Sequence, residues 1–187
     1  MLSILPDGDL PEWAKRLRDE DASWMRVAQR GVQSFVAHAM LDHVPFAMET
    51  VFSFWQERPG DTPASKIDLI RDMQRAGYFV LLLFVGLSSA ALSYARVETR
   101  KAQGGHAVPA QKLLERFPRT QRAISSALTV ADAAILVDNS RSEKYAFSVC
   151  RVQLKNEEIY DCRRGRVPPQ KATLKWLDVV APLGSAV

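Results

Sequence analysis

Residues 77–95 contain no charged side chain, and this stretch decides between two very different classes of protein. Its length approaches the roughly 20 residues that cross a bilayer as a helix. Residues 78–85, however, form a short run rich in aromatic and branched side chains, which is typical of a buried parallel strand. Gly86 interrupts this run, and Ser88 or Ser89 can cap a helix that continues into polar sequence. We therefore expect a strand followed by a helix, and not a membrane span.

The sequence around this stretch alternates between helical and strand-like patterns. We expect helices over residues 11–17, 20–41, 63–76, 89–103, 108–116, 119–131 and 171–179. Strands are expected over 46–50, 78–85 and 133–137, a loop over 59–63, and a small C-terminal hairpin from 145–154 and 157–161. Such alternation is typical of an α/β protein with a parallel sheet flanked by helices.

Polar residues follow three of the expected strands. They are Glu49 and Thr50, Ser88 and Ser89, and the run Asp138-Asn139-Ser140. In open parallel sheets, ligands bind at the carboxyl ends of the strands, so a binding site is expected where these clusters meet. Asp, Asn and Ser also favour turns, and we interpret the run at 138–140 first as turn chemistry.

The composition describes an ordinary globular chain of 187 residues with 47% hydrophobic and 25% charged side chains. Its 25 basic and 21 acidic residues leave a net charge of +4, which does not indicate a nucleic-acid partner. The two cysteines are too far apart for a CxxC site and too few for a disulfide framework. The N-terminus lacks the pattern of a secretion signal. We expect a cytoplasmic protein without a metal site of its own.

Several short motifs occur in a fixed order along residues 20–154. They are FAMET (46–50), RAGY (75–78), VGL (85–87), ARV (95–97), GGHAVP (104–109), RFPR (116–119), and AD followed by DNS (131–140). In order and spacing they resemble the zeta-toxin family of ATP-dependent kinases in the P-loop superfamily. The resemblance implies one kinase-like domain, with a variable segment at 1–19, a body at 20–154 and a C-terminal extension at 155–187.

The resemblance implies a reaction and a set of site residues. ATP with Mg²⁺ would donate its γ-phosphoryl group to a hydroxyl of a small acceptor such as a UDP-amino sugar, and an antitoxin-like helical protein is a possible partner. Glu49, with Thr50, would hold the acceptor. Arg96 and His106 would face the phosphates, and a mobile lid with Gly104 and Gly105 as its hinge would carry further arginines, namely Arg100, Arg116 and Arg119. Phosphoryl transfer needs positive charge of this kind around the migrating group.

Each of these residues also has an ordinary structural explanation. Arg96 and Arg100 are one helical turn apart and could lie on a solvated helix face. His106 could be a turn residue, and Glu49 could cap a helix or pair with an arginine. The basic run at 163–166 is expected to be a solvated loop.

Two features of the family are absent from the 187 residues. No Gly-x-x-x-x-Gly-Lys-[Ser/Thr] string occurs, and the family's position for it would fall before Met1. The position of the catalytic aspartate is taken by Pro11, with Asp9 and Glu12 as the nearest acids. We therefore hold three explanations open: a fragment, a relative that binds without catalysing, or a missing half supplied by another chain. The alternative function is a catalytically inactive interaction protein built on the same frame.

Overall fold

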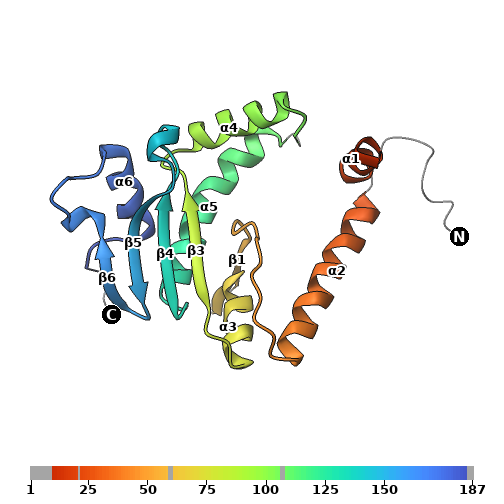
Figure 1. The fold of residues 1–187 in the computed structure, drawn as a ribbon, viewed down its shortest axis with the longest axis horizontal. Helices are drawn as coiled ribbons and strands as arrows, with labels where there is room; N and C mark the ends of the chain where they lie inside the picture. Colours follow the sequence, from red (N-terminus) through yellow and green to blue (C-terminus); the bar gives the residue numbers. More distant parts are fainter. Residues whose placement is uncertain (1–9, 21, 59–60, 106–107, 185–187) are drawn as a thin grey trace, which may run out of the picture. The chain divides into compact units, whose positions relative to one another are not determined.

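The computed structural model describes residues 10–20, 22–58, 61–105 and 108–184, and it divides the chain into two compact units, Met1–Met48 and Glu49–Val187. The first unit contains two helices, α1 (Leu10–Glu20) and α2 (Ala22–Leu41), close to the expected ranges (Figure 1). The rings of Trp13 and Trp24 lie 6.3 Å apart between centroids and join the two helices. At the end of α2, His43 adopts a left-handed backbone conformation (φ 53°).

The second unit contains a four-stranded sheet in the order β3-β4-β5-β6. Its strands are β3 (Leu81–Gly86), β4 (Ala133–Asp138), β5 (Ser148–Leu154) and β6 (Glu157–Asp161). The α/β class is as expected, but the sheet is mixed: β3 and β4 are parallel, whereas β5 runs antiparallel to both of its neighbours. The segment between β4 and β5 is too short for the crossover that a parallel neighbour requires. The turn at Lys155 and Asn156 closes the expected hairpin.

A second, two-stranded sheet corrects two expectations from the sequence. β1 (Trp55–Arg58) pairs antiparallel with β2 (Asp61–Ser65). The expected strand at 46–50 has no regular secondary structure, because no strand in the described part of the chain pairs with it. The expected loop at 59–63 is partly β2, while residues 59 and 60 lie outside the described residues.

The helix that follows, α3 (Ile67–Arg75), starts later than the sequence indicated, because Pro63 lies within β2. The hydroxyl of Ser65 accepts a hydrogen bond from the backbone N–H of Ile67 at 3.2 Å. The helix ends as expected at Gly77, whose φ of 86° is the left-handed conformation that favours glycine.

Two helices connect β3 to β4. The first, α4 (Ala90–Ala102), is capped as predicted by Ser89, whose hydroxyl accepts a hydrogen bond from the N–H of Leu92 at 3.2 Å. The second, α5 (Ala110–Leu128), is one continuous helix where the sequence indicated two. Pro118 lies inside it and removes only the backbone hydrogen bond to Leu114, a residue that is half exposed to water. Within the described residues, no helix is both long and apolar enough to cross a membrane.

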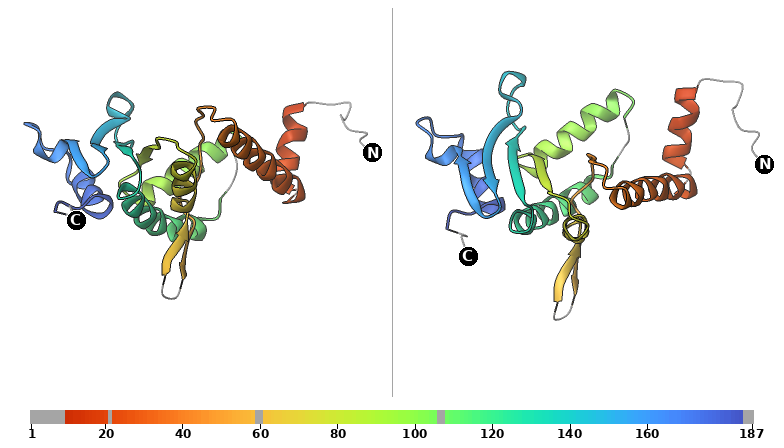
Figure 2. Two further views of the ribbon diagram at one scale, coloured as in Figure 1. Left: turned by 90° about the horizontal axis from the view of Figure 1, so that it is seen from below. Right: turned by 60° about the horizontal axis from the view of Figure 1, so that its bottom comes forward.

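The main core lies between one face of the sheet and the helices α5 and α6 (Lys171–Val180), which cover the same side (Figures 1 and 2). Its members come from both helices and from the central strands, namely Ile124, Leu128, Ala134, Leu136, Cys150, Trp176, Leu177 and Val180. Trp176 packs so closely on Gly86 that a Cβ atom at Gly86 would lie 2.2 Å from its ring. The C-terminal helix is therefore an integral part of this core.

Candidate functional site

The carboxyl ends of the two parallel strands lie side by side, with Gly86 of β3 opposite Asp138 of β4. The backbone N–H of Asn139 donates to the carbonyl of Gly86 at 3.0 Å, and the N–H of Ser88 donates to the hydroxyl of Ser140 at 2.7 Å. The structure therefore brings together two of the three polar clusters that the sequence placed at this edge. These groups bond to one another and form a closed turn, which we call the strand-end turn (residues 86–88 and 138–140).

Asp138 anchors this turn from inside. Its side chain is fully buried, and its Oδ1 accepts a hydrogen bond from the N–H of Ser140 at 2.8 Å. Its Oδ2 accepts a hydrogen bond from the hydroxyl of Thr173 in α6 at 2.6 Å. Both carboxylate oxygens are occupied, which agrees with the interpretation of residues 138–140 as turn chemistry. A threonine in the first turn of an amphipathic helix carries no sequence signal, so Thr173 was missed.

Arg96 reaches the strand-end turn from α4. Its guanidinium Nη2 donates a hydrogen bond to the backbone carbonyl of Asn139 in a partly buried setting. The side chain is thus at the sheet edge where ligands of α/β proteins bind. A guanidinium has five N–H donors, so this bond leaves most of them for other acceptors. The role of Arg96 at a phosphate stays a prediction.

The side-chain hydrogen bonds of two other expected arginines, Arg100 and Arg119, do not lead to the guanidinium of Arg96. Nε of Arg100 donates to the backbone carbonyl of Arg96 at 3.4 Å, and Nε of Arg119 donates to that of Glu115 at 3.1 Å. Both side chains therefore fold back on their own helices, α4 and α5. Arg116 is a partly exposed residue of α5. The lid assignment of these residues stays a prediction.

Gly104 and Gly105 end α4 in a Schellman motif. The N–H of Gly105 bonds to the carbonyl of Arg100 at 2.7 Å, and that of Gly104 to Lys101 at 3.0 Å. Gly104 has a φ of 85°, and a Cβ atom at Gly105 would lie 2.7 Å from the Arg100 carbonyl oxygen. Helix termination by itself therefore requires both glycines, and a hinge role stays a prediction. His106 lies outside the described residues.

Glu49 and Thr50 begin the second unit and are exposed in an irregular segment. Between the residues that the structure describes, no hydrogen bond or ion pair joins either side chain to Arg96 or to the strand-end turn. The acceptor-binding role of these two residues stays a prediction.

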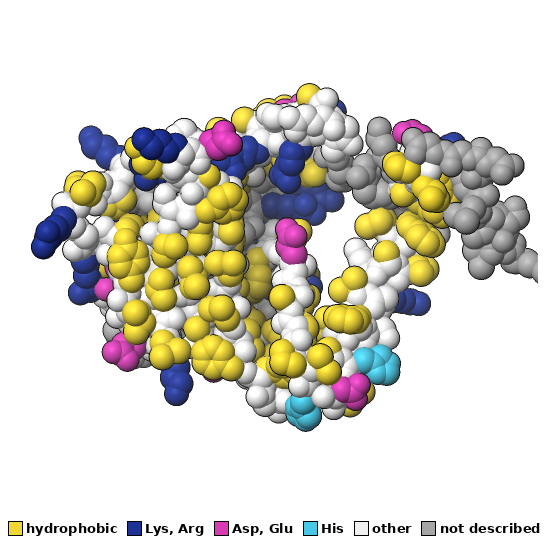
Figure 3. Space-filling model, viewed as in Figure 1, with side chains coloured by type: hydrophobic (Ala, Val, Ile, Leu, Met, Phe, Trp, Pro, Cys, Tyr) yellow, Lys and Arg dark blue, Asp and Glu magenta, His cyan; other side chains and the backbone are white. Residues whose placement is uncertain are grey.

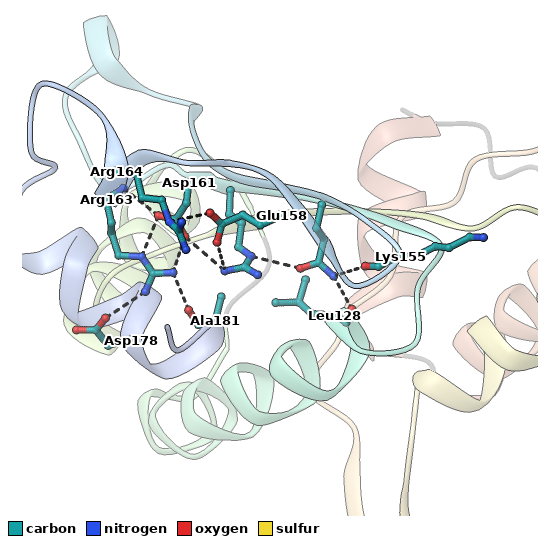
Figure 4. A network of polar contacts seen from close by, with 10 residues as sticks. Leu128, Lys155, Glu158, Asp161, Arg163, Arg164, Asp178 and Ala181 are labelled. Atoms are coloured by element: carbon teal, nitrogen blue, oxygen red, sulfur yellow. Dashed lines mark hydrogen bonds and ion pairs between the residues drawn. The ribbon is translucent and has the colours of Figure 1, made fainter. Parts of the chain in front are cut away.

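A buried ionic cluster at the β6 edge of the sheet was not predicted from the sequence (Figure 4). Arg163 holds Asp161 through two hydrogen bonds, Nε to Oδ1 at 2.9 Å and Nη2 to Oδ2 at 2.5 Å. It also donates to the carbonyl of Ala181 at 2.8 Å and to Asp178 of α6 at 3.2 Å. Arg151 approaches Asp161 at 3.4 Å. The expected solvated loop at 163–166 is therefore wrong for Arg163, whose side chain is 5% exposed.

The charges of this cluster are mutually stabilised. Burial by itself raises the pKa of Asp161, but hydrogen bonds from Arg163 and the charges of Arg163 and Arg151 outweigh it and hold the pKa below its usual value. The hydrogen bonds to Asp161 raise the pKa of Arg163 in return. A hollow of about 360 Å³ borders the cluster and includes Arg151, Glu158 and Arg164 in its lining. Arg151 and Arg164 both pair with Glu158, and Arg151 also approaches Asp161, so the charged groups that line the hollow already have partners.

Among the described residues, no group of three or more His, Cys, Asp or Glu side chains is arranged to hold a metal ion. No family model, no curated protein and no solved structure matches this chain.

Proposed function

We propose that this chain is the body of a zeta-toxin-like phosphotransferase, which acts on a hydroxyl of a small acceptor such as a UDP-amino sugar when a nucleotide-binding loop is present. The observation that carries the proposal is the position of Arg96 at the carboxyl edge of the parallel pair β3–β4. Phosphoryl transfer relies on positive charge that is fixed before the reaction begins. Arg96 is fixed by its bond to Asn139, and its free N–H donors suit an anionic group.

The residues present do not fit ATP and Mg²⁺. The sequence has no glycine-rich phosphate loop, and the N–H groups of Ser88 and Leu92, which follow β3, already bond to Ser140 and Ser89. We therefore assign no ATP site and no transfer step to this chain. Its own contribution in this proposal is to bind the acceptor, with Glu49 on the sugar hydroxyls, and to supply the arginine.

Binding of UDP-N-acetylglucosamine to the 187-residue chain, measured by isothermal titration calorimetry, tests the proposal. We expect saturable binding that is weakened about 10- to 100-fold by Glu49→Gln, since a hydrogen bond to a charged group is worth roughly 1.5–3 kcal/mol. Glu157→Gln removes the charge of an exposed carboxylate at the β5–β6 turn, outside the proposed site; it is the matched control and should bind as the parent does. Absence of binding, or equal binding by Glu49→Gln, would contradict the proposal.

A second candidate function is that of a non-catalytic interaction protein built on the same frame. The observation that favours it is an apolar face of the four-stranded sheet that no described helix of the second unit covers (Figures 1 and 3). Extensive exposed apolar surface marks interaction sites in folded proteins. An antitoxin-like helical protein is one partner that the family resemblance suggests. A chain that binds no nucleotide sugar but does bind a protein through this face would support the second function over the first.

A further inference from the structure

Within the described part of the second unit, one face of the four-stranded sheet carries no covering helix. Along β3, Leu82 and Phe84 turn toward the cores, while the alternate residues point away from them. Residues directly opposite each other in neighbouring strands share a face of the sheet. The residues of β4, β5 and β6 that are in register with the outward residues of β3 therefore lie on the same face. We call this surface the open face, and its most exposed members are Leu81, Leu83, Val85, Val149, Leu154 and Tyr160.

The residue types on the open face are those normally found on a buried face of a sheet. A sheet with one face in water normally alternates apolar residues inside with polar residues outside. Here the outward residues of β3 and β4 are all Leu, Val, Ala or Ile, and the six most exposed members of the face are 42–59% exposed. Figure 3 shows a broad area of hydrophobic side chains over the sheet. Water contact on this scale is costly, so the face requires a partner surface.

The extent of the open face matches a specific interface. Large apolar side chains present on the order of 150–200 Å² each when fully exposed, so the six members offer roughly 500 Å². Two such faces together bury about 1,000 Å², which reaches the lower limit of specific protein interfaces. Charged residues lie beyond its ends, with Lys155 and Glu157 at the β5–β6 turn and Glu143 and Lys144 before β5. An apolar centre inside a charged border is the usual anatomy of an interface.

We propose that the open face is the interface of a homodimer, in which a second copy of this chain packs face to face across a twofold axis. The occupant must be uncharged, extended in two dimensions and similar in area, and the open face itself meets all three conditions. A twofold axis makes one patch serve both copies. Two twisted sheets pack in this way at about 10 Å with their strands within about 30° of each other. This inference gives the interaction role a specific partner and is independent of acceptor binding.

Sedimentation equilibrium of the 187-residue chain tests the dimer. We expect a reversible dimer with a dissociation constant on the order of micromolar, as suits a small interface. Leu83→Glu, in the middle of strand β3 on the open face, should weaken the dimer at least about 100-fold, because it places an unpaired charge in a dry contact. Val179→Glu on α6, where Val179 is 57% exposed, is the matched control and should leave the dimer intact. Circular dichroism should show both variants folded.

Tyr160→Lys provides a second variant on the outer strand β6 if Leu83→Glu perturbs β3, and it should also give monomers. A dimer that survives either folded variant contradicts the inference, because another surface then mediates it. A monomeric parent chain also contradicts it, and binding of the dye ANS then reports whether the open face is exposed to solvent. ANS binding that Leu83→Glu abolishes indicates a face open to a different protein. The absence of ANS binding indicates that residues 1–48 of the same chain cover the face.

Discussion

Thr173 donates a hydrogen bond of 2.6 Å to Asp138, and both side chains are buried, with 4% and 0% of their surfaces exposed. The bond joins the first turn of the C-terminal helix α6 to the carboxyl end of β4. A buried carboxyl group is tolerated only when its oxygens have hydrogen-bond partners, and the second oxygen accepts the N–H of Ser140. The strand-end turn therefore depends on a residue 35 positions further along the chain.

Replacement of Thr173 by valine, which has nearly the same shape, should lower the free energy of unfolding by about 1.5–3 kcal/mol. The loss arises because Oδ2 of Asp138 stays buried without a donor. Thr173→Ser keeps the hydroxyl and should recover most of this difference. Urea denaturation followed by circular dichroism measures both variants. Equal stability of the valine variant and the parent would show that water replaces the threonine hydroxyl.

Much of the fold could be predicted from the sequence, because its strongest elements carry local signals. The uncharged run at 77–95 divides into β3 and α4 as expected, and Ser89 and Gly77 cap their helices as predicted. The wrong predictions concern strands, whose formation depends on a pairing partner elsewhere in the chain. Residues 46–50 have the composition of a strand but no neighbour to pair with, and the β1–β2 hairpin is a pairing of short polar segments. Strand pairing of this kind is a tertiary property.

The candidate site was less predictable than the fold. Periodicity placed Ser88 and the run at 138–140 at one sheet edge, and Ser88 does meet Ser140 of that run there. Sequence could not show that Asp138 would be satisfied by Thr173, since the two residues meet only through the packing of α6. It also gave no sign that Arg163, within a basic run, would be buried on Asp161. Contacts between distant segments set both outcomes.

The pair Arg163–Asp161 should be a major determinant of stability in the second unit. Arg163→Ala should cost about 3–5 kcal/mol, because it leaves the buried Asp161 carboxylate without its two closest donors. Arg164→Ala is the control: its side chain is 70% exposed and pairs with Glu158 at the surface, so about 1 kcal/mol or less is expected. Chemical denaturation compares the two variants. A similar loss in both would show that Arg151 alone suffices for Asp161.

Asp132 should make the stability of the protein dependent on acid pH. The N–H of Val80 and the side chain of Gln74 donate hydrogen bonds to it at 2.9 and 3.0 Å, and they lower its pKa. A carboxyl group with a lowered folded-state pKa stabilises the protein above the unfolded value of about 3.9. This contribution is lost as the pH falls through the folded pKa.

Asp132→Ala should therefore destabilise the protein most at neutral pH, and the difference from the parent should shrink below about pH 4. Asp72→Ala removes an exposed carboxylate that pairs with Arg75 on α3, and it should have a small effect over the same range. Urea titrations at several pH values provide the measurement. A difference that stays constant with pH would assign the role of Asp132 to packing.

Both cysteines should react with iodoacetamide more slowly than an ordinary thiol, and Cys150 should be the slower of the two. Burial, with the nearby Cys162 and Asp138, raises the pKa of Cys150 to about 12. At pH 8 only about one thiol in 10⁴ is then the reactive thiolate, against about one in four for a free cysteine with a pKa near 8.5. Burial also raises the pKa of Cys162, which is only half-buried. Mass spectrometry should thus find Cys162 modified first and Cys150 modified at the rate of unfolding.

A Cys162→Ser variant isolates Cys150, and its labelling should accelerate in urea together with the loss of structure. Rapid labelling of Cys150 in the folded variant would mean that the core around Trp176 and Leu136 opens far more often than its burial implies.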